Sequence, residues 1–393
     1  MDTLRVRAYN VRFGDAILIS VPDRDPSGTV TTRHILIDVG NVLAGEGGQD
    51  ALFQPVVDNI LQVLDGKPLD LYIMTHEHMD HIQGLYYAES KFFLNGEDEL
   101  RSKLNTQSAW LTASAADDYY ESHPDAKKQH LMREEIYEDI KAYMSASQRD
   151  FPDEVNALLV NNNPRKTLEC VDYLKQLSGH SHFAHRESDY INHHPFKEAQ
   201  IKIWAPEENT ARYYGHFESM ALGVSRPDDG NTSSVLAEVK PPPGVDAGAF
   251  YHLVESRRRY YDNLLAIDKA ANNTSIVFCL EWRGWRLLFP GDAEERSWKT
   301  MAQENVLQPV HFLKIGHHGS HNGTPDLELL EKILPMQPHD DKPRSALVST
   351  FEGTYNNVPD EKTLEIIAGR IDDLVVVHDQ SQPGGFVDLE FPG

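Results

Sequence analysis

Residues 71–85, LYIMTHEHMDHIQGL, place three histidines and two acidic residues within six positions, directly after an apolar run. Imidazole nitrogens and carboxylate oxygens are common protein ligands of zinc and related divalent ions. On a tight loop, His76 and His78 could converge on one ion while Asp80 and His81 bind a second. The motif therefore predicts a site for two adjacent metal ions at the end of a strand.

Other strand-like segments of the chain also end in potential metal ligands. They are ILIDVG with Asp38, LLFPGDAE with Asp292, and LKIGHHGSHNG with His317 and His318. Ligands in layered α/β proteins gather at the carboxyl ends of strands. A single His-x-His pair is more often a solvated turn, but such a turn does not account for several strand-end motifs in one chain. We therefore favour a metal centre.

This combination of motifs resembles the metallo-β-lactamase superfamily, whose pattern is an early strand-end Asp, then H-x-H-x-D-H, a later Gly-Asp and a final His. The metallo-β-lactamase domain of the ComEC competence branch is the most similar group. The resemblance rests on GDAILI, ILIDVG, THEHMDH, NNTSIVFCLEWRGWRLLFPGDAE and LKIGHHGSHNGTPDLELLEKILP. It covers roughly residues 4–90, 199–206 and 272–391.

The resemblance implies a fold and a domain organisation. The fold would be an α/β protein of the metallo-β-lactamase type, an αββα four-layer sandwich. One such domain would span residues 1–393, with a mainly helical insertion at residues 95–198 that the resemblance does not cover.

The resemblance also implies a role for each matching side chain, with the metal ligands divided between two ions. These ligands are His76 and His78 for the first ion, Asp80, His81 and His317 for the second, and Asp292 as a bridge. Asp38 would orient a ligand, and His318 and Ser320 would line the site, so that Asp80, His318 and Asp38 form the catalytic set. The adjacent residues His317 and His318 could exchange roles.

The sequence has no obvious third histidine ligand for the first ion just before the strand-like segment IKIWAP. The segment SGHSHFAHRESDYINHHP offers five candidates, which are His180, His182, His185, His193 and His194. Because so many histidines stand together, we favour a histidine-rich surface loop over a metal ligand here.

Composition restricts the partners of the protein. The chain of 393 residues has 61 acidic and 37 basic residues and a formal net charge of −24, which repels polyanions at long range. It has no 18-residue apolar run and no apolar signal segment at its start, which predicts a cytoplasmic protein without a membrane partner. Cys170 and Cys279 are expected to be free thiols.

The pattern of apolar residues predicts which elements position the motifs. Strands are expected at residues 4–11, 15–21, 33–40 and 69–75, with a helix at 50–66 and another beginning near His81. Helical patterns then dominate up to about residue 178. A second strand-rich block follows residue 273, and it starts with a hairpin that turns at Arg283 and Gly284.

The predicted function is that of a metal-dependent hydrolase with two divalent ions, Zn²⁺ in first place and Mn²⁺ in second. The favoured reaction is phosphodiester hydrolysis by a metal-bound hydroxide, because the resemblance implies a nuclease. The acidic composition favours single-stranded nucleic acid or a nucleotide-like substrate over long duplexes. One alternative is an acyl hydrolase acting on a lactone, thioester or amide. Another is a non-catalytic scaffold that binds a protein partner, or a second copy, through the helical insertion.

Overall fold

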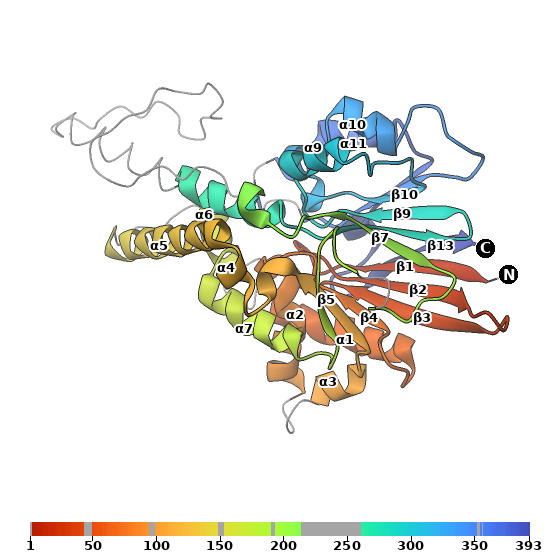
Figure 1. Ribbon diagram of the computed structural model, residues 1–393, viewed down its shortest axis with the longest axis horizontal. Coiled ribbons are helices and arrows are strands. Elements are labelled where there is room, and N and C mark those ends of the chain that lie inside the picture. Colours follow the sequence, from red (N-terminus) through yellow and green to blue (C-terminus); the bar gives the residue numbers. More distant parts are fainter. Residues whose placement is uncertain are drawn as a thin grey trace.

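A computed structural model describes residues 2–42, 49–93, 99–147, 153–189, 193–213, 261–351, 354–355 and 357–393. Two β-sheets lie face to face, and helices cover the outer face of each sheet (Figure 1). The chain is therefore an α/β protein whose layers run helix, sheet, sheet, helix.

The first sheet has seven strands in the order β13-β1-β2-β3-β4-β5-β6. Their bounds are β1 Thr3–Tyr9, β2 Ile17–Arg24, β3 Val30–Ile37, β4 Leu71–Ile73, β5 Ser108–Thr112, β6 Ser181–Ala184 and β13 Phe386–Pro392. Neighbours from β13 to β3 pair antiparallel, and neighbours from β3 to β6 pair parallel. The carboxyl ends of four parallel strands consequently share one edge of the sheet.

The second sheet has six strands in the order β12-β11-β10-β9-β8-β7. Their bounds are β7 Gln200–Ala205, β8 Val277–Trp282, β9 Trp285–Phe289, β10 Phe312–Lys314, β11 Ser345–Val348 and β12 Asp373–Val376. β7, β8 and β9 pair antiparallel, whereas β9 to β12 pair parallel. The predicted hairpin is confirmed, since Arg283 and Gly284 join β8 to β9 with φ of 44° and 78°, as two-residue hairpin turns require.

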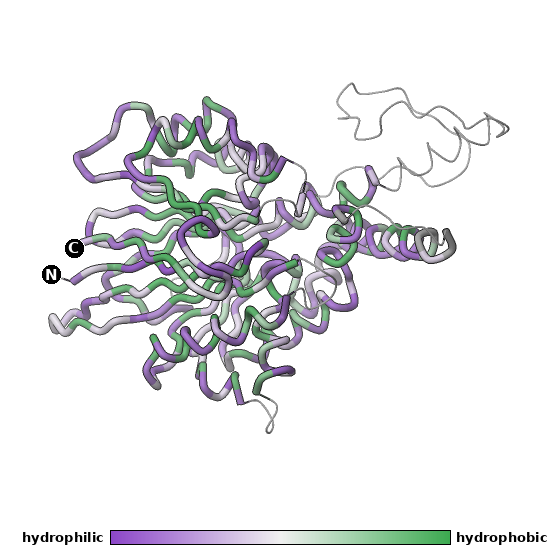
Figure 2. Tube along the Cα trace, turned by 180° about the vertical axis from the view of Figure 1, so that it is seen from behind, coloured by the Kyte–Doolittle hydropathy of each residue, from purple (hydrophilic) through white to green (hydrophobic). Residues whose placement is uncertain are grey.

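Apolar side chains from both sheets fill the space between them. Phe278 and Phe289 stack with ring centroids 5.1 Å apart, and Trp110 and Trp282 are also fully buried. Figure 2 shows hydrophobic residues recurring along the strands of both sheets. This shared core fixes the two sheets relative to each other, and with them the edges that carry the predicted ligands.

Four helices cover the first sheet and three cover the second. They are α1 Phe53–Leu64, α2 Met79–Phe92, α3 Glu99–Leu104 and α7 Pro164–Lys175 on the first, and α9 Glu295–Gln303, α10 Leu327–Ile333 and α11 Glu361–Ala368 on the second. In α1, Val56, Val57, Ile60 and Leu64 lie on one buried face, as their spacing predicts. The helix ends at Leu64, because the next residue, Asp65, has a left-handed φ of 50° that stops the helical hydrogen-bonding pattern.

The remaining helices extend beyond the layers. They are α4 Tyr119–Ser122, α5 Pro124–Ser147, α6 Asp153–Asn161 and the helical residues 261–272 (Figure 1). A separate cluster joins α5, α6 and residues 261–272, and it is made of Ile136, Ile140, Leu158, Leu264 and Ile267. The described residues between 99 and 189 are thus mainly helical, and they also contribute β5 and β6 to the first sheet.

Short elements complete the described chain. They are η1 Asp50–Leu52, η2 Ala113–Ala115, η3 Thr210–Tyr213, η4 His317–Gly319, η5 His321–Gly323 and α12 Val377–Gln380. Within the described ranges, none of the helices is both long and apolar enough to cross a membrane. Cys170 and Cys279 are buried free thiols, as expected.

The core between the sheets predicts the effect of shortening a side chain there. Phe278→Ala should lower the free energy of unfolding by about 3–5 kcal/mol, because it removes buried apolar area and leaves a cavity. Chemical denaturation measures this change. Leu168→Ala is the control, since Leu168 is 58% exposed and its loss should change stability by about 0.5 kcal/mol or less. Equal effects of the two substitutions would contradict the described core.

Candidate metal centre

The carboxyl ends of parallel strands bring the predicted ligands together. Asp38 follows β3 and His76 follows β4 in the first sheet, while Asp292 follows β9 and His318 follows β10 in the second. Asp80 lies in the first turn of α2, where the positive end of the helix dipole favours a carboxylate. Residues up to 280 positions apart in sequence therefore meet at one end of the two sheets.

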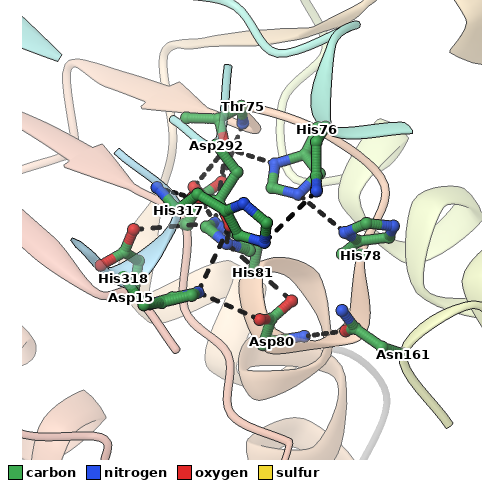
Figure 3. A network of polar contacts seen from close by, with 12 residues as sticks. Asp15, Thr75, His76, His78, Asp80, His81, Asn161, Asp292, His317 and His318 are labelled. Carbon is green, nitrogen blue, oxygen red and sulfur yellow. Dashed lines mark hydrogen bonds and ion pairs between the residues drawn. The ribbon is translucent and has the colours of Figure 1, made fainter. Parts of the chain in front are cut away.

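Two overlapping groups of side chains have the geometry to hold a metal ion. The first group is His76, His78 and Asp80, and the second group is Asp80, His81, Asp292 and His318. In each group, one potential ligand atom per residue lies within 4.8 Å of all the others. Figure 3 shows these side chains turned toward a common centre. Since all six residues are buried, they form a preorganised site rather than a surface cluster.

The second group is tightly packed. Nε2 of His318 lies 3.1 Å from Oδ2 of Asp80 and 3.3 Å from Oδ2 of Asp292. Nε2 of His81 lies 3.2 Å from the same Asp292 oxygen and 3.9 Å from Oδ1 of Asp80. Two imidazoles and two carboxylates thus direct their ligand atoms into one small volume.

Several of these ligand atoms have no hydrogen-bond partner. They are Oδ1 of Asp80, Nε2 of His81 and Oδ2 of Asp292, all in buried positions. A buried polar atom without a partner is costly, and a carboxylate oxygen more so. A divalent cation would satisfy all three at once, so the residues fit the metal ions that the sequence predicts.

Outer hydrogen bonds fix the imidazoles of the second group. Nδ1 of His81 donates to Oδ2 of Asp38 at 2.8 Å, and Asp38 in turn accepts from the backbone N and the Oγ1 of Thr75 at 2.8 and 2.6 Å. Nδ1 of His318 donates to the carbonyl of Ser349 at 2.9 Å. Both rings therefore present Nε2 to the centre, which is the arrangement that metal-binding histidines use. The predicted orienting role of Asp38 agrees with this geometry.

The first group depends on two asparagines at the end of α6. Nε2 of His76 and Nδ1 of His78 face each other at 3.1 Å, and Nε2 of His78 donates to Oδ1 of Asn162 at 3.0 Å. Oδ1 of Asn161 accepts from the backbone N of Asp80 at 3.1 Å. The sequence analysis missed both asparagines, and the only signal for them was the run of three asparagines at the end of a helical segment.

The structure exchanges the roles predicted for the two adjacent histidines. His318 joins Asp80, His81 and Asp292, whereas His317 lies in a different group with Asp268 and Glu294. Of the two assignments that the sequence left open, this grouping favours His318 as the ligand beside Asp80 and Asp292. The exchange follows from the backbone, because φ is 47° at His317 and 53° at His318, so the two rings diverge.

Two further details differ from the implied roles. Asp80 is the residue common to both groups, whereas Asp292 lies only in the second, so a residue shared between two ions would be Asp80. Ser320 is buried, but its Oγ accepts from the backbone N of Gly323 and begins η5. Ser320 thus shapes the loop that follows His318.

None of the five additional histidines joins either group among the described residues. His182 and His193 stack on each other at 4.0 Å, and His194 lies beside Trp110. The prediction of a histidine-rich surface loop is wrong for His182, which lies in β6 and pairs with β5. The Nε2 of His78 lies instead 3.0 Å from Asn162 and 3.6 Å from Asp268.

A buried lysine balances part of the negative charge. Lys314, in β10, is fully buried, and its Nζ pairs with Asp15 and lies 4.0 Å from Oδ1 of Asp292. Asp15 belongs to the GDAILI segment, 299 positions away. An ammonium group here offsets the repulsion between carboxylates that share a site of low dielectric constant.

The electrostatics of the centre raise the pKa of two histidines and lower the pKa of a third. Burial alone would lower the pKa of His318, but the carboxylates of Asp292 and Asp80 raise it to about 9. The same carboxylates, with Asp38, raise the pKa of His81 well above its usual value despite burial. Burial, with the neighbouring His81, holds the pKa of His76 well below its usual value. Without metal, therefore, His81 and His318 carry protons at neutral pH.

The backbone of the centre adopts conformations that side-chain-bearing residues rarely use. Asp38 has a φ of 49°, in addition to the positive φ of His317 and His318. Such strain concentrates at functional sites, where surrounding contacts hold it. Gly40 allows the loop after β3 to lie against α2, since a Cβ at this position would come within 2.4 Å of the backbone C of Asp80.

Comparison with models of known protein families finds no match to this chain, and a search of curated proteins finds none either. What the centre can do chemically therefore follows from its own geometry. Buried imidazole and carboxylate groups, fixed by outer hydrogen bonds and short of partners, are suited to binding divalent cations.

The contact between Asn162 and His78 predicts the effect of removing an outer partner. Asn162→Ala should weaken metal binding about 10- to 100-fold, because His78 loses the acceptor that fixes its tautomer and orientation. Titration of the metal-free protein with Zn²⁺ measures the change. Asn305→Ala is the matched control, since this exposed asparagine lies beyond α9. Unchanged affinity in the folded Asn162 variant would contradict the role of Asn162.

The raised pKa of His318 predicts how the stability of the metal-free protein depends on pH. The folded pKa of about 9 exceeds the unfolded value of about 6.5, so the stabilisation is complete below pH 6.5 and is lost as the pH rises to 9. Denaturation of chelator-treated protein should show this decrease, and His318→Gln should reduce its slope. Metal affinity should rise over the same range, because fewer protons are displaced. Stability that stays constant or increases would contradict this assignment.

Proposed function

We propose that this protein is a metal-dependent hydrolase that carries a dinuclear centre and cleaves phosphodiester bonds. The observation that carries the proposal is the pair of buried ligand groups that share Asp80, with three ligand atoms that have no hydrogen-bond partner. A shared carboxylate suits two ions about 3.5–4 Å apart, the spacing of two-metal hydrolases.

The proposed fold class is the αββα sandwich of the metallo-β-lactamase superfamily. Two features support it. The two sheets pack face to face between helical layers, and the motifs at Asp38, His76, Asp292 and His318 all lie at the ends of strands on one side of that sandwich. The order of these motifs along the chain is the order that the resemblance implies.

When bound, divalent ions would supply Lewis-acid activation of water and of the phosphoryl group. The residues of the chain have a different task, which is to hold these ligands in one geometry. Asp38 fixes His81, the carbonyl of Ser349 fixes His318, and Asn162 fixes His78. Because these outer contacts are already in place, the reaction needs little rearrangement of the protein, and burial strengthens the electrostatic interactions.

The proposed ions are Zn²⁺ or Mn²⁺, and the proposed substrate is single-stranded nucleic acid or a small phosphodiester. The mixed set of imidazole and carboxylate ligands accepts either metal. The net charge of −24 disfavours association with long duplexes, whose binding depends on many phosphate contacts. A short or single-stranded substrate makes fewer such contacts.

The proposal is tested by metal analysis combined with cleavage assays. Untagged protein should bind metal at the centre and cleave bis(p-nitrophenyl) phosphate and a labelled single-stranded oligonucleotide. Asp80→Ala should reduce cleavage by more than about 100-fold, the upper limit for loss of an outer partner, because it removes a ligand common to both groups. Asp117→Ala changes an exposed carboxylate and should leave cleavage intact.

The other outcomes identify the alternatives. Bound metal without cleavage of either phosphodiester, but with turnover of a lactone or thioester, would replace the proposal with an acyl hydrolase. Protein that binds no metal and cleaves neither kind of substrate would favour the hypothesis of a non-catalytic scaffold.

A further inference from the structure

A third group of potential ligands lies beside the dinuclear centre. Asp268, from the helical residues 261–272, meets Glu294 and His317, with one ligand atom from each within 4.8 Å of the other two. Glu294 directly precedes α9, and His317 directly follows the loop from β10. Asp268 is 7% exposed and Glu294 is 4% exposed. Neither the sequence motifs nor the proposed reaction explains this group.

A fully buried asparagine points into the same group. Nδ2 of Asn272 lies 2.7 Å from Oε1 of Glu294, 3.4 Å from Oδ2 of Asp268 and 3.4 Å from Nε2 of His317. The Oδ1 of Asn272 has no hydrogen-bond partner. A half-turn of the amide would place this oxygen in the group, and a cation bound there would replace the contacts that Nδ2 makes with Glu294 and Asp268. The side chain can therefore present either a donor or a fourth ligand oxygen.

The two carboxylates lack a basic partner of the kind found elsewhere in the centre. Asp15 pairs with Lys314, but among the described residues neither Asp268 nor Glu294 forms an ion pair with a lysine or arginine. The nearest basic group is Nδ1 of His317, 3.5 Å from Oε1 of Glu294, and this nitrogen has no hydrogen-bond partner. Buried carboxylates require a cation or strong hydrogen bonds.

The backbone between β10 and η5 positions one histidine in the dinuclear centre and one in the third group. His317 and His318 have left-handed φ values of 47° and 53°, and their ring centroids lie 6.3 Å apart. His318 therefore faces Asp80 and Asp292, while His317 faces Glu294. This pair of residues with left-handed φ thus delivers one imidazole to each group.

We propose that Asp268, Glu294 and His317, with Asn272 as a fourth ligand, bind a third divalent cation beside the dinuclear centre. Three oxygens and one imidazole form a ligand set that suits Mn²⁺. Asp268 also connects this site to the first group, because its Oδ1 accepts from Nδ2 of Asn162 at 2.8 Å and lies 3.6 Å from Nε2 of His78. The side chain of Asn162 thus links the proposed third site to His78, a proposed ligand of the first ion.

The test is the number of Mn²⁺ ions bound by the full chain. Another described cluster, His311, His339 and Asp340, lies near the protein surface and could also bind metal, so all measurements use the His339→Ala background. Chelator-treated protein is dialysed against saturating MnCl₂, and bound manganese is determined by elemental analysis. The background protein should bind three equivalents.

Substitutions within the third group should remove one equivalent selectively. Asp268→Asn combined with Glu294→Gln should bind two, and so should His317→Gln, which changes a partly exposed residue and guards against misfolding of the double variant. Glu295→Gln, at the adjacent exposed carboxylate, should still bind three. Asp80→Ala should lose manganese from the dinuclear centre and keep the third ion, which separates this proposal from the proposed function.

Two outcomes would overturn the third site. One is a background protein that binds no more than two equivalents at saturation and loses none of them in the double variant. The other is retention of three equivalents by both the folded double variant and His317→Gln, since the third ion would then lie elsewhere.

Discussion

The structure depends on the burial of several carboxylates in one small volume between two sheets. Asp15, Asp38, Asp80 and Asp292 all lie within the protein at the same edge of the sandwich, where each would repel the others strongly. Lys314 and the two basic histidines supply positive charge, yet ligand atoms of the centre remain without partners. A divalent cation held by these buried groups would complete this balance.

The surrounding layers explain how such a centre is maintained. The apolar core between the sheets holds their edges together, and the loops at those edges carry the charged groups. The helical region joins the same centre, since α6 ends in Asn161 and Asn162, which contact the first turn of α2 and the ring of His78. The cluster of α5, α6 and residues 261–272 is therefore connected to the ligands through the side chains of Asn161, Asn162 and Asp268.

Close backbone approach and strain give the ligands their directions. Gly40 lets the loop after β3 touch the start of α2, and the positive φ at Asp38 turns its carboxylate toward His81 and Thr75. The left-handed conformations of His317 and His318 separate two neighbouring imidazoles. Each of these conformations costs energy that the outer hydrogen bonds and the core must offset.

The sequence by itself determined the strands, the hairpin at Arg283 and which histidine and aspartate side chains stand at strand ends, because apolar periodicity and residue spacing are local properties. Tertiary structure decided the directions of side chains and the contacts between distant residues, which local patterns do not contain. The direction of His317 and His318 depends on backbone angles held by neighbouring loops. Asn162 and Lys314 meet their partners across 84 and 299 positions, and Asp268 reaches Glu294 from a different element, so only the packing of helices and sheets brings them to the centre.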